Sequence, residues 1–380
     1  MKNRSERISV KRGYSQSQDE AEAVRELAEQ IDQPDASVTV LFASSKYDLK
    51  RLAGEVKRTF TEPVIGCTTS GEITPEGYAR ESLSGFRIAS DELEVYPYFI
   101  PSLHDFNSEK INEVVNSIQR QISHSYQKKP EARCFGLLLI DGLSLMEERV
   151  IAILANSVSD VPIAGGSAGD DLNLEKTYVY SGGEFVSDAA LFALFITTLP
   201  FKVIKTQHFS ATDKRLVITR ADPEKRIVHE INGRAAAEEY ARVIGINLDD
   251  LKHFVYFTSP LMLRVGGEYY VRSIQKVNND GSLTFFSAID EGLVLRVAES
   301  ENFVNNLNNT FNQVRTEIPN IKLTIGFDCI LRRLEVVDNE LENEVNEILK
   351  QNKVIGFSTY GEQFKGVHIN QTLTGIVLGE

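Results

Sequence analysis

The feature that most constrains this chain is a short stretch that recurs three times. VIGCTTSGEI at 64–73, PIAGGSAGD at 162–170 and VIGFSTYGE at 354–362 align without gaps, and each joins an apolar run to a small-residue turn that ends on an acid. An apolar strand and a helical segment precede each copy. The recurrence predicts one β-α-β unit, used twice in the first half of the chain and once in the second.

The units have similar internal spacing. Their opening strands begin near residues 38, 134 and 323. Ser144 and Glu147 stand at the spacing of a capping box, in which each side chain bonds the other residue's backbone N–H. The predicted helices cover roughly 46–59, 144–158 and 335–351.

Hairpins and further helices fill the rest of the chain. We expect helices at 19–31 and 108–125, and a hairpin of strands 85–89 and 92–100. Turns at Gly182-Gly183 and Asn279-Asp280-Gly281 predict two more hairpins.

Together these patterns predict an α/β fold with two mixed α/β domains built from hairpins and repeated β-α-β units. We place an N-terminal arm and helix at 1–34, a first domain at 35–200 and a second at 201–380. Pro200 marks the boundary.

Composition excludes several classes of protein. A formal net charge of −13 disfavours nucleic-acid binding, which needs a basic face, and anionic membrane surfaces. The longest apolar run, 189–199, is too short to span a bilayer and predicts a buried strand. Three scattered cysteines favour a reducing cytoplasm and argue against structural zinc.

The three turns are the candidate binding sites. Small residues at a strand end let a ligand approach backbone N–H groups, but the terminal acid of each turn would repel phosphate. We therefore expect a cationic or amino-bearing small molecule; the alternative is that the turns only seat one strand against its neighbour. The predicted ligand-binding residues are Gly66, Thr69, Gly71, Glu72, Gly169, Asp170, Gly361 and Glu362.

Histidines and one cysteine supply other candidates. No two of the six histidines stand at metal-ligand spacing, but a single imidazole suffices for haem iron. His208, beside Phe209 at the end of an apolar strand, is the first candidate ligand, followed by His229 and His368; the alternative for each is a structural role. Cys67 sits where a strand-end nucleophile would sit, although a buried thiol explains it too. No catalytic residue is assigned.

These motifs resemble a known family. VIGCTTSGEI, PIAGGSAGDD, EINGRAAAEEY, YVRSI, GFDCILRR and VIGFSTYGE with HINQT are together similar to the FIST sensory family, over about residues 35–375. The resemblance covers both the N-terminal and the C-terminal FIST modules. It implies a signal-transduction sensor of small ligands without a catalytic set of its own.

A chain of this length with only FIST modules also resembles the NosP group. That resemblance implies a cytoplasmic sensor that binds haem, responds to nitric oxide and regulates a separate histidine kinase or cyclic-di-GMP enzyme. One alternative is a haem-free receptor for a small ligand such as an amino acid. A second is a hydrolase that uses Cys67. A homo-oligomer is left open.

Overall fold

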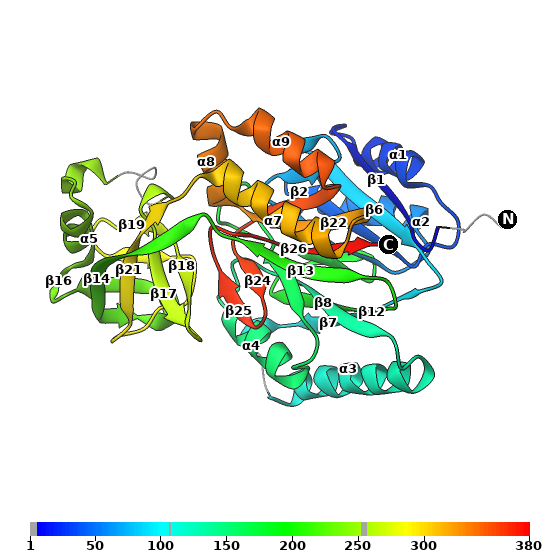
Figure 1. Cartoon of the computed structure of the whole chain (residues 1–380), viewed down its shortest axis with the longest axis horizontal. Helices are drawn as coiled ribbons and strands as arrows, with labels where there is room; N and C mark the ends of the chain where they lie inside the picture. The colour runs from blue at the N-terminus through cyan, green and yellow to red at the C-terminus, as the bar shows by residue number, and fades with distance from the viewer. Residues whose placement is uncertain (1–5, 106–107, 252–256) are drawn as a thin grey trace.

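Three units of the same build, and one domain inserted into the third, make up the structure. The computed structural model describes residues 6–105, 108–251 and 257–380. Figure 1 shows the inserted domain at one end of the molecule, green to yellow, and the three units packed together beside it.

The first unit contains β1 (Ser9–Ser15), α1 (Glu20–Ile31), β2 (Val38–Ser44), α2 (Leu49–Thr59), β3 (Val64–Thr69), β4 (Glu72–Thr74), β5 (Gly77–Ala79) and β6 (Leu83–Ala89). The second contains β7 (Leu93–Pro101), α3 (Ser108–Lys128), β8 (Arg133–Ile140), α4 (Glu147–Ser157), β9 (Ile163–Ser167), β10 (Val179–Ser181), β11 (Glu184–Val186) and β12 (Ala189–Thr197). The third contains β13 (Phe201–Thr206), α7 (Phe303–Glu317), β22 (Ile321–Cys329), α8 (Ile330–Asp338), α9 (Glu342–Gln351), β23 (Val354–Thr359), β24 (Glu362–Phe364), β25 (Val367–Ile369) and β26 (Leu373–Gly379).

The inserted domain, residues 209–300, lies between β13 and α7 and forms a sheet of its own. Its elements are β14 (Phe209–Asp222), β15 (Ile227–Ile231), β16 (Arg234–Ala235), α5 (Ala236–Ile244), β17 (Leu261–Val265), β18 (Glu268–Arg272), β19 (Ile274–Val277), β20 (Leu283–Phe285) and β21 (Val294–Ser300).

The three units exchange hairpins in a closed cycle. The first sheet runs β1-β6-β2-β3 and ends with the β10-β11 hairpin of the second unit. The second runs β7-β12-β8-β9 and ends with β24 and β25 of the third unit, and the third runs β13-β26-β22-β23 and ends with β4 and β5 of the first. Each unit therefore completes the sheet of another.

Helices cover the outside of each sheet, and the inner faces meet in one core. Within each unit the β-α-β crossover makes a parallel pair, β2 with β3, β8 with β9 and β22 with β23. The central core joins residues of all three sheets, with Phe42 and Phe357 of different units 5.0 Å apart between ring centroids. Burial of these apolar faces is the main stabilising force for the arrangement.

Local signals explain where helices begin. The Asp19 carboxylate accepts the Glu22 N–H at the start of α1, and Asp48 does the same for two N–H groups of α2. The predicted capping box is wrong, because Met146 precedes α4 and has no side-chain cap bond. The Glu147 carboxylate bonds Arg226 of the inserted domain instead.

Several other expectations can be compared with this structure. The α/β fold class, the three β-α-β units and the hairpins at 182–183 and 279–281 are confirmed. The predicted hairpin of 85–89 with 92–100 is wrong, because β6 and β7 lie in different sheets. The predicted helix at 335–351 is two helices, α8 and α9.

Three further regions also bear on the expectations. The run 189–199 contains β12, a strand buried along its whole length, as predicted. Residues 9–15 form an edge strand that the arm prediction did not include, and residues 1–5 of that arm lie outside the described residues. The predicted domain boundary at 200 falls between β12 and β13, where the second unit gives way to the third, and stays a prediction.

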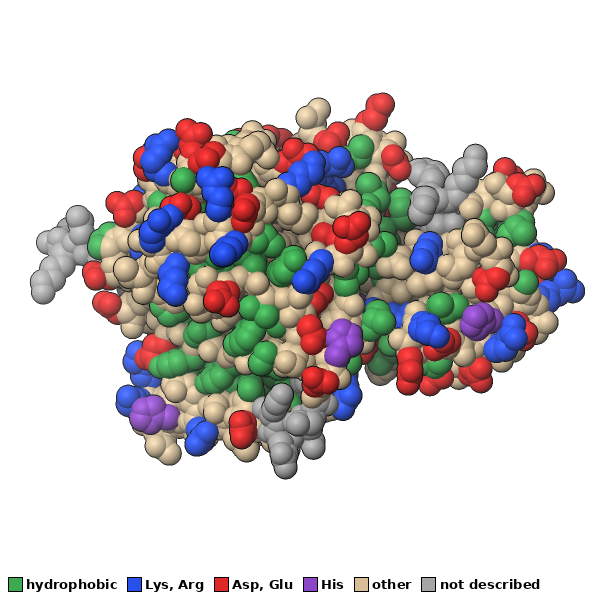
Figure 2. Space-filling model, turned by 180° about the vertical axis from the view of Figure 1, so that it is seen from behind, with side chains coloured by type: hydrophobic (Ala, Val, Ile, Leu, Met, Phe, Trp, Pro, Cys, Tyr) green, Lys and Arg blue, Asp and Glu red, His purple; other side chains and the backbone are tan. Residues whose placement is uncertain are grey.

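The outer surface is mixed in charge. Figure 2 shows acidic and basic side chains interspersed over both the three packed units and the inserted domain on the face drawn. Among the described residues, no helix combines the length and apolar character needed to cross a bilayer.

Candidate functional site

The carboxyl ends of the three parallel strand pairs converge on one place. Ser70 N–H donates to the Ser358 carbonyl at 3.0 Å, and Ser358 N–H donates back to the Gly71 carbonyl at 2.7 Å. Ser167 N–H donates to the Gly361 carbonyl at 2.9 Å, and Gly169 N–H to the Thr68 carbonyl at 3.0 Å. The recurrent turns therefore bond one another in a ring, and the carboxyl ends of parallel strands are where α/β proteins bind ligands.

A cavity of about 240 Å³ opens beside this ring, and we call it the turn cavity. All three units contribute to its wall. The residues that line it are Lys46, Ser70, Arg80, Glu81, Asp171, Leu172, Ile330 and Leu334.

A negative charge with one oxygen unpartnered among the described residues lies in the wall of the turn cavity. Asp171 Oδ2 is buried and has no hydrogen-bond partner among the described residues. Its pKa is raised because burial outweighs the attraction of Lys46, Arg333 and Arg80. Backbone strain accompanies it, since Asp171 and Leu172 have φ of 57° and 65°. Such strain gathers at functional sites.

Arg333 on α8 is a buried positive charge close enough to attract Asp171, although it does not line the cavity itself. Its Nη2 donates to the Ala79 carbonyl at 2.7 Å, whereas its Nη1 is buried and has no hydrogen-bond partner in the described structure. A Cβ on Gly71, which has φ +109°, would lie 1.7 Å from that Nη1, so glycine there leaves room for the guanidinium. Burial lowers the pKa of Arg333 from its ordinary value, with Arg80 adding repulsion.

The acids predicted as ligand contacts are bonded within the fold. Glu72 accepts from Ser82 N–H at 3.2 Å and from the Thr69 hydroxyl at 2.5 Å, and Glu362 accepts from Thr372 N–H at 3.0 Å. Burial raises the pKa of Glu72 to about 7 and that of Glu362 well above its usual range.

Asp170 has a comparable internal role. It accepts the N–H groups of Leu174, Glu175 and Lys176, which closes the loop after β9. It also accepts the hydroxyl of Tyr360.

The predicted glycines and threonine serve close packing. A Cβ on Gly66 would lie 2.3 Å from the Leu41 carbonyl oxygen, one on Gly169 2.2 Å from Ser70 Oγ, and one on Gly361 2.2 Å from His368 Cε1. Thr69 bonds its own turn. None of the eight predicted ligand-binding residues is among those that line the turn cavity, and direct ligand contact by them stays a prediction.

Sequence reasoning missed the residues that do line it. Ser70 and Asp171 adjoin predicted positions. Arg333, which lies near Asp171 without lining the cavity, is in the GFDCILRR motif and had no assigned role. The signal that could have found Arg333 is an arginine in a helix that directly follows a parallel strand of a repeated unit.

His208, the first predicted haem ligand, uses both of its ring nitrogens. Nε2 lies 2.9 Å from a Glu335 oxygen, and Nδ1 lies 2.8 Å from Nη1 of Arg332. A guanidinium only donates, so Nδ1 accepts, Nε2 carries the proton, and the ring is neutral. Burial lowers its pKa, consistent with that form. In this arrangement both ring nitrogens are engaged in hydrogen bonds, so neither can bind an iron.

The other two predicted histidines differ from it. His229 is half-buried on β15 of the inserted domain. His368 is buried on β25, where Nδ1 contacts Gln363 at 3.1 Å and Nε2 has no hydrogen bond within normal geometry. His368 packs closely on Gly361, where an added Cβ would lie 2.2 Å from Cε1 and 2.6 Å from Nε2, so an iron-bound porphyrin would need this packing to open. In the described part of the chain, no three His, Cys, Asp or Glu side chains form a metal-binding group.

Cys67 is fully buried on β3, and burial raises the pKa of its thiol well above the ordinary value. A thiol in that state is a poor nucleophile.

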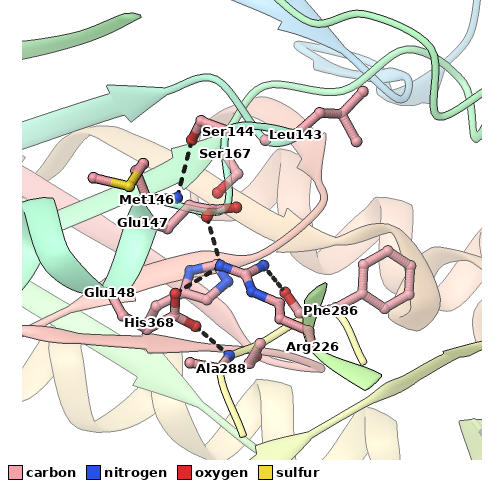
Figure 3. A network of polar contacts seen from close by, with 12 residues as sticks. Leu143, Ser144, Met146, Glu147, Glu148, Ser167, Arg226, Phe286, Ala288 and His368 are labelled. Carbon is pink, nitrogen blue, oxygen red and sulfur yellow. Dashed lines mark hydrogen bonds and ion pairs between the residues drawn. The ribbon is translucent and has the colours of Figure 1, made fainter. Parts of the chain in front are cut away.

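A second polar cluster, the Arg226 cluster, joins the inserted domain to the second unit (Figure 3). Arg226 Nη2 lies 2.7 Å from both Glu147 and Glu148, and its Nη1 bonds the Phe286 carbonyl. Glu148 also accepts the Ala288 N–H at 2.6 Å. Arg226, Glu147 and Glu148 are paired with one another, so this cluster fastens two parts of the chain.

Comparisons with known proteins agree on both halves of the chain. The FIST N domain matches residues 37–234, and the FIST C domain matches residues 236–365. The chain is also similar to uncharacterized protein MJ1623 of Methanocaldococcus jannaschii, at 24% identity over 358 residues, which covers 83% of this chain and 67% of that protein.

Proposed function

Because the chain belongs to the FIST family of signal-transduction sensors of small ligands, we propose that the turn cavity is its ligand site. The observation that carries the proposal is a pair of buried atoms of opposite charge, Asp171 Oδ2 and Arg333 Nη1, neither of which has a hydrogen-bond partner in the part of the chain that the structure describes. An unsatisfied buried polar atom costs about 1–3 kcal/mol, more when charged, so the fold bears a cost that a ligand would remove.

The charges point to a small zwitterion. An ammonium group would pair with Asp171, and a carboxylate would take the free N–H of Arg333, assisted by Arg80. The cavity, about 240 Å³, has room for a ligand of amino-acid size. Leu172 and Leu334 supply an apolar wall for a short side chain. This favours the receptor for an amino acid or a similar amino-bearing acid.

A thermal-shift screen of the common L-amino acids, followed by calorimetry on hits, tests the proposal. A ligand at 100 times its dissociation constant should add about 2.7 kcal/mol to the free energy of unfolding. We expect Asp171→Asn and Arg333→Met to remove most of that gain. Asparagine tolerates the positive φ of residue 171, so the first change alters charge with little strain.

Two matched controls should keep the gain. Asp35→Asn changes an exposed aspartate with a similar φ of 55°, and Arg25→Met changes an exposed arginine of α1. A hit that binds equally well to Asp171→Asn and Arg333→Met would place the ligand elsewhere and end the proposal.

Haem binding with a response to nitric oxide is our second proposal, and one observation favours it: Nε2 of His368 makes no hydrogen bond of normal geometry to the described residues. It requires a rearrangement of the packing at Gly361. A haem titration read by absorbance, repeated with nitric oxide, tests it on the wild type and on His368→Ala, with His208→Ala and His229→Ala for comparison. A spectrum unchanged by all three substitutions would remove these histidines as ligands.

A sensor of either kind needs a partner. A separately encoded histidine kinase or cyclic-di-GMP enzyme in the cytoplasm remains our expectation for that partner. Co-purification of the ligand-bound and ligand-free protein with such an enzyme would test it.

A further inference from the structure

One helix touches both the turn cavity and the base of the inserted domain. On α8, Ile330 and Leu334 line the cavity, and Arg333 of the same helix attracts Asp171 in the cavity wall. Arg332 and Glu335 of the same helix bond His208. One short helix therefore contacts both places.

His208 sits where the chain enters and leaves the inserted domain, a place we call the junction (residues 207–209 and 300–302). The Glu301 N–H donates to the His208 carbonyl at 2.7 Å. The next residue, Phe209, pairs with Ser300 in the first rung of β14 with β21. His208 is therefore bonded to α8 through its ring and to the returning strand through its backbone carbonyl.

The junction is held by a buried cluster, the His208 cluster (Tyr78, His208, Asp328, Arg332 and Glu335). Arg332 Nε donates to Asp328 at 2.7 Å, and the Tyr78 hydroxyl bonds the same carboxylate. Buried networks with every group bonded are rigid, because each lost bond leaves an uncompensated polar group.

The helix is also part of the packing of the inserted domain. Ile330 and Leu331 belong to the same apolar cluster as Leu216, Phe285 and Leu295 of that domain. Close-packed interiors transmit strain instead of absorbing it.

We propose, resting on the function proposed above, that α8 couples occupancy of the turn cavity to the position of the inserted domain through Arg332, Glu335 and His208. A ligand that draws Arg333 and Leu334 into one arrangement favours one orientation of the junction. The inserted domain is then the moving part that a partner reads. A ligand shifts this equilibrium only by its differential affinity for the two arrangements.

Filling the cavity by mutation tests the coupling without a known ligand. Leu172 lines the cavity from the second unit and does not belong to α8, so Leu172→Trp pushes on the helix from outside. The chain has no tryptophan, so the emission maximum of the new side chain reports whether it entered the cavity. Leu334→Trp replaces it if the first tryptophan stays in solvent.

The readout is amide hydrogen exchange at the junction, above all at Glu301. We expect about a tenfold change in its protection when the cavity is filled. Leu248→Trp, at an exposed leucine of the inserted domain that does not line the cavity, should cause none. Adding Glu335→Ala to the filled variant should reduce the change to less than about threefold, whereas adding Glu342→Ala, an exposed acid of α9, should preserve it.

The outcomes separate the two proposals. Unchanged protection at Glu301 with a buried tryptophan would overturn the coupling, and so would a change that survives Glu335→Ala. Failure of all amino acids to bind the wild type would overturn the proposed ligand class alone.

Discussion

Two buried arginines show how differently the same side chain is used in this molecule. Arg226 and Arg333 are 3% and 5% exposed. Arg226 bonds two carboxylates and a carbonyl, whereas Arg333 bonds one carbonyl and its Nη1 has no hydrogen-bond partner among the described residues. Burial opposes both charges, but Glu147 and Glu148 outweigh it at Arg226 and raise its pKa, while the pKa of Arg333 is lowered. Arg226 therefore has a structural role, whereas Arg333 has an N–H group left to bind a ligand.

Arg226→Met should cause the largest loss of stability. It leaves Glu147 and Glu148 buried without their cation, and breaking a buried pair costs about 3–5 kcal/mol. Urea unfolding would measure the loss, with Arg25→Met as the exposed control within about 0.5 kcal/mol of wild type. A loss as small as the control's would mean that the Arg226 cluster is hydrated and the contrast between the arginines is wrong.

The pH dependence of stability should reveal that Arg333 is a weak partner for Glu72. Burial raises the folded pKa of Glu72 to about 7, above 4.5, although Ser82, Thr69 and Arg333 oppose the rise. The stability that protonated Glu72 contributes to the free energy of unfolding is therefore fully present below pH 4.5 and is lost as pH rises through 7. At about 1.36 kcal/mol per pKa unit, wild type should lose up to roughly 3 kcal/mol relative to Glu72→Gln across this window.

Unfolding of both proteins at several pH values would measure this difference. If the free energy of unfolding depends on pH in the same way in both proteins, Glu72 stays ionised in the folded state. Arg333 would then be its ionic partner, and the contrast with Arg226 would be wrong.

Gly169→Ala tests whether the cavity wall is rigid. The new Cβ would lie 2.2 Å from Ser70 Oγ and 2.8 Å from Ser70 N, so a backbone must move. We expect a loss of about 1–3 kcal/mol in the free energy of unfolding. Gly54→Ala in α2, where nothing lies within 4 Å, should instead gain roughly 0.5–1 kcal/mol. If Gly169→Ala and Gly54→Ala change the free energy of unfolding equally, the cavity wall can move, and Arg333 could then reach hydrogen-bond partners.

Arg333→Met should have the smallest effect on stability. It removes a buried charge that has no carboxylate partner, so we expect a change of less than about 1 kcal/mol in either direction. Its consequence should appear in ligand binding, as described above. A loss comparable with that of Arg226→Met would show that Arg333 also fastens the fold.

The sequence predicted what is local. The repeated units follow from hydrophobic period and turn residues, and Gly182-Gly183 is a hairpin signal within a few residues. It did not predict the exchange of hairpins. Strands of three residues such as β4 and β10 pair through backbone groups, which are the same in every residue and do not specify a partner strand. The short connection at Ser90-Asp91 misled for the same reason, because it leads from one unit into the next.

The candidate site divides along the same line. The three turns were located correctly because glycine and small hydroxyl residues mark tight backbone anywhere. Arg226 and Glu147 are 79 residues apart, and Arg333 reaches Ala79 over 254 residues. Whether a charge is paired depends on these contacts between residues far apart in the sequence. The sequence pattern therefore could not distinguish the paired Arg226 from Arg333, whose Nη1 is unbonded among the described residues.

The cyclic exchange of hairpins also decides when the protein can fold during synthesis. The first sheet is completed only by residues 179–186, and the second only by residues 362–369. A nascent chain therefore holds the edge of the second sheet unpaired until residues 362–369 have been synthesised, although domains generally fold as units as they emerge. The three units thus cannot finish folding one after another in the order of the chain.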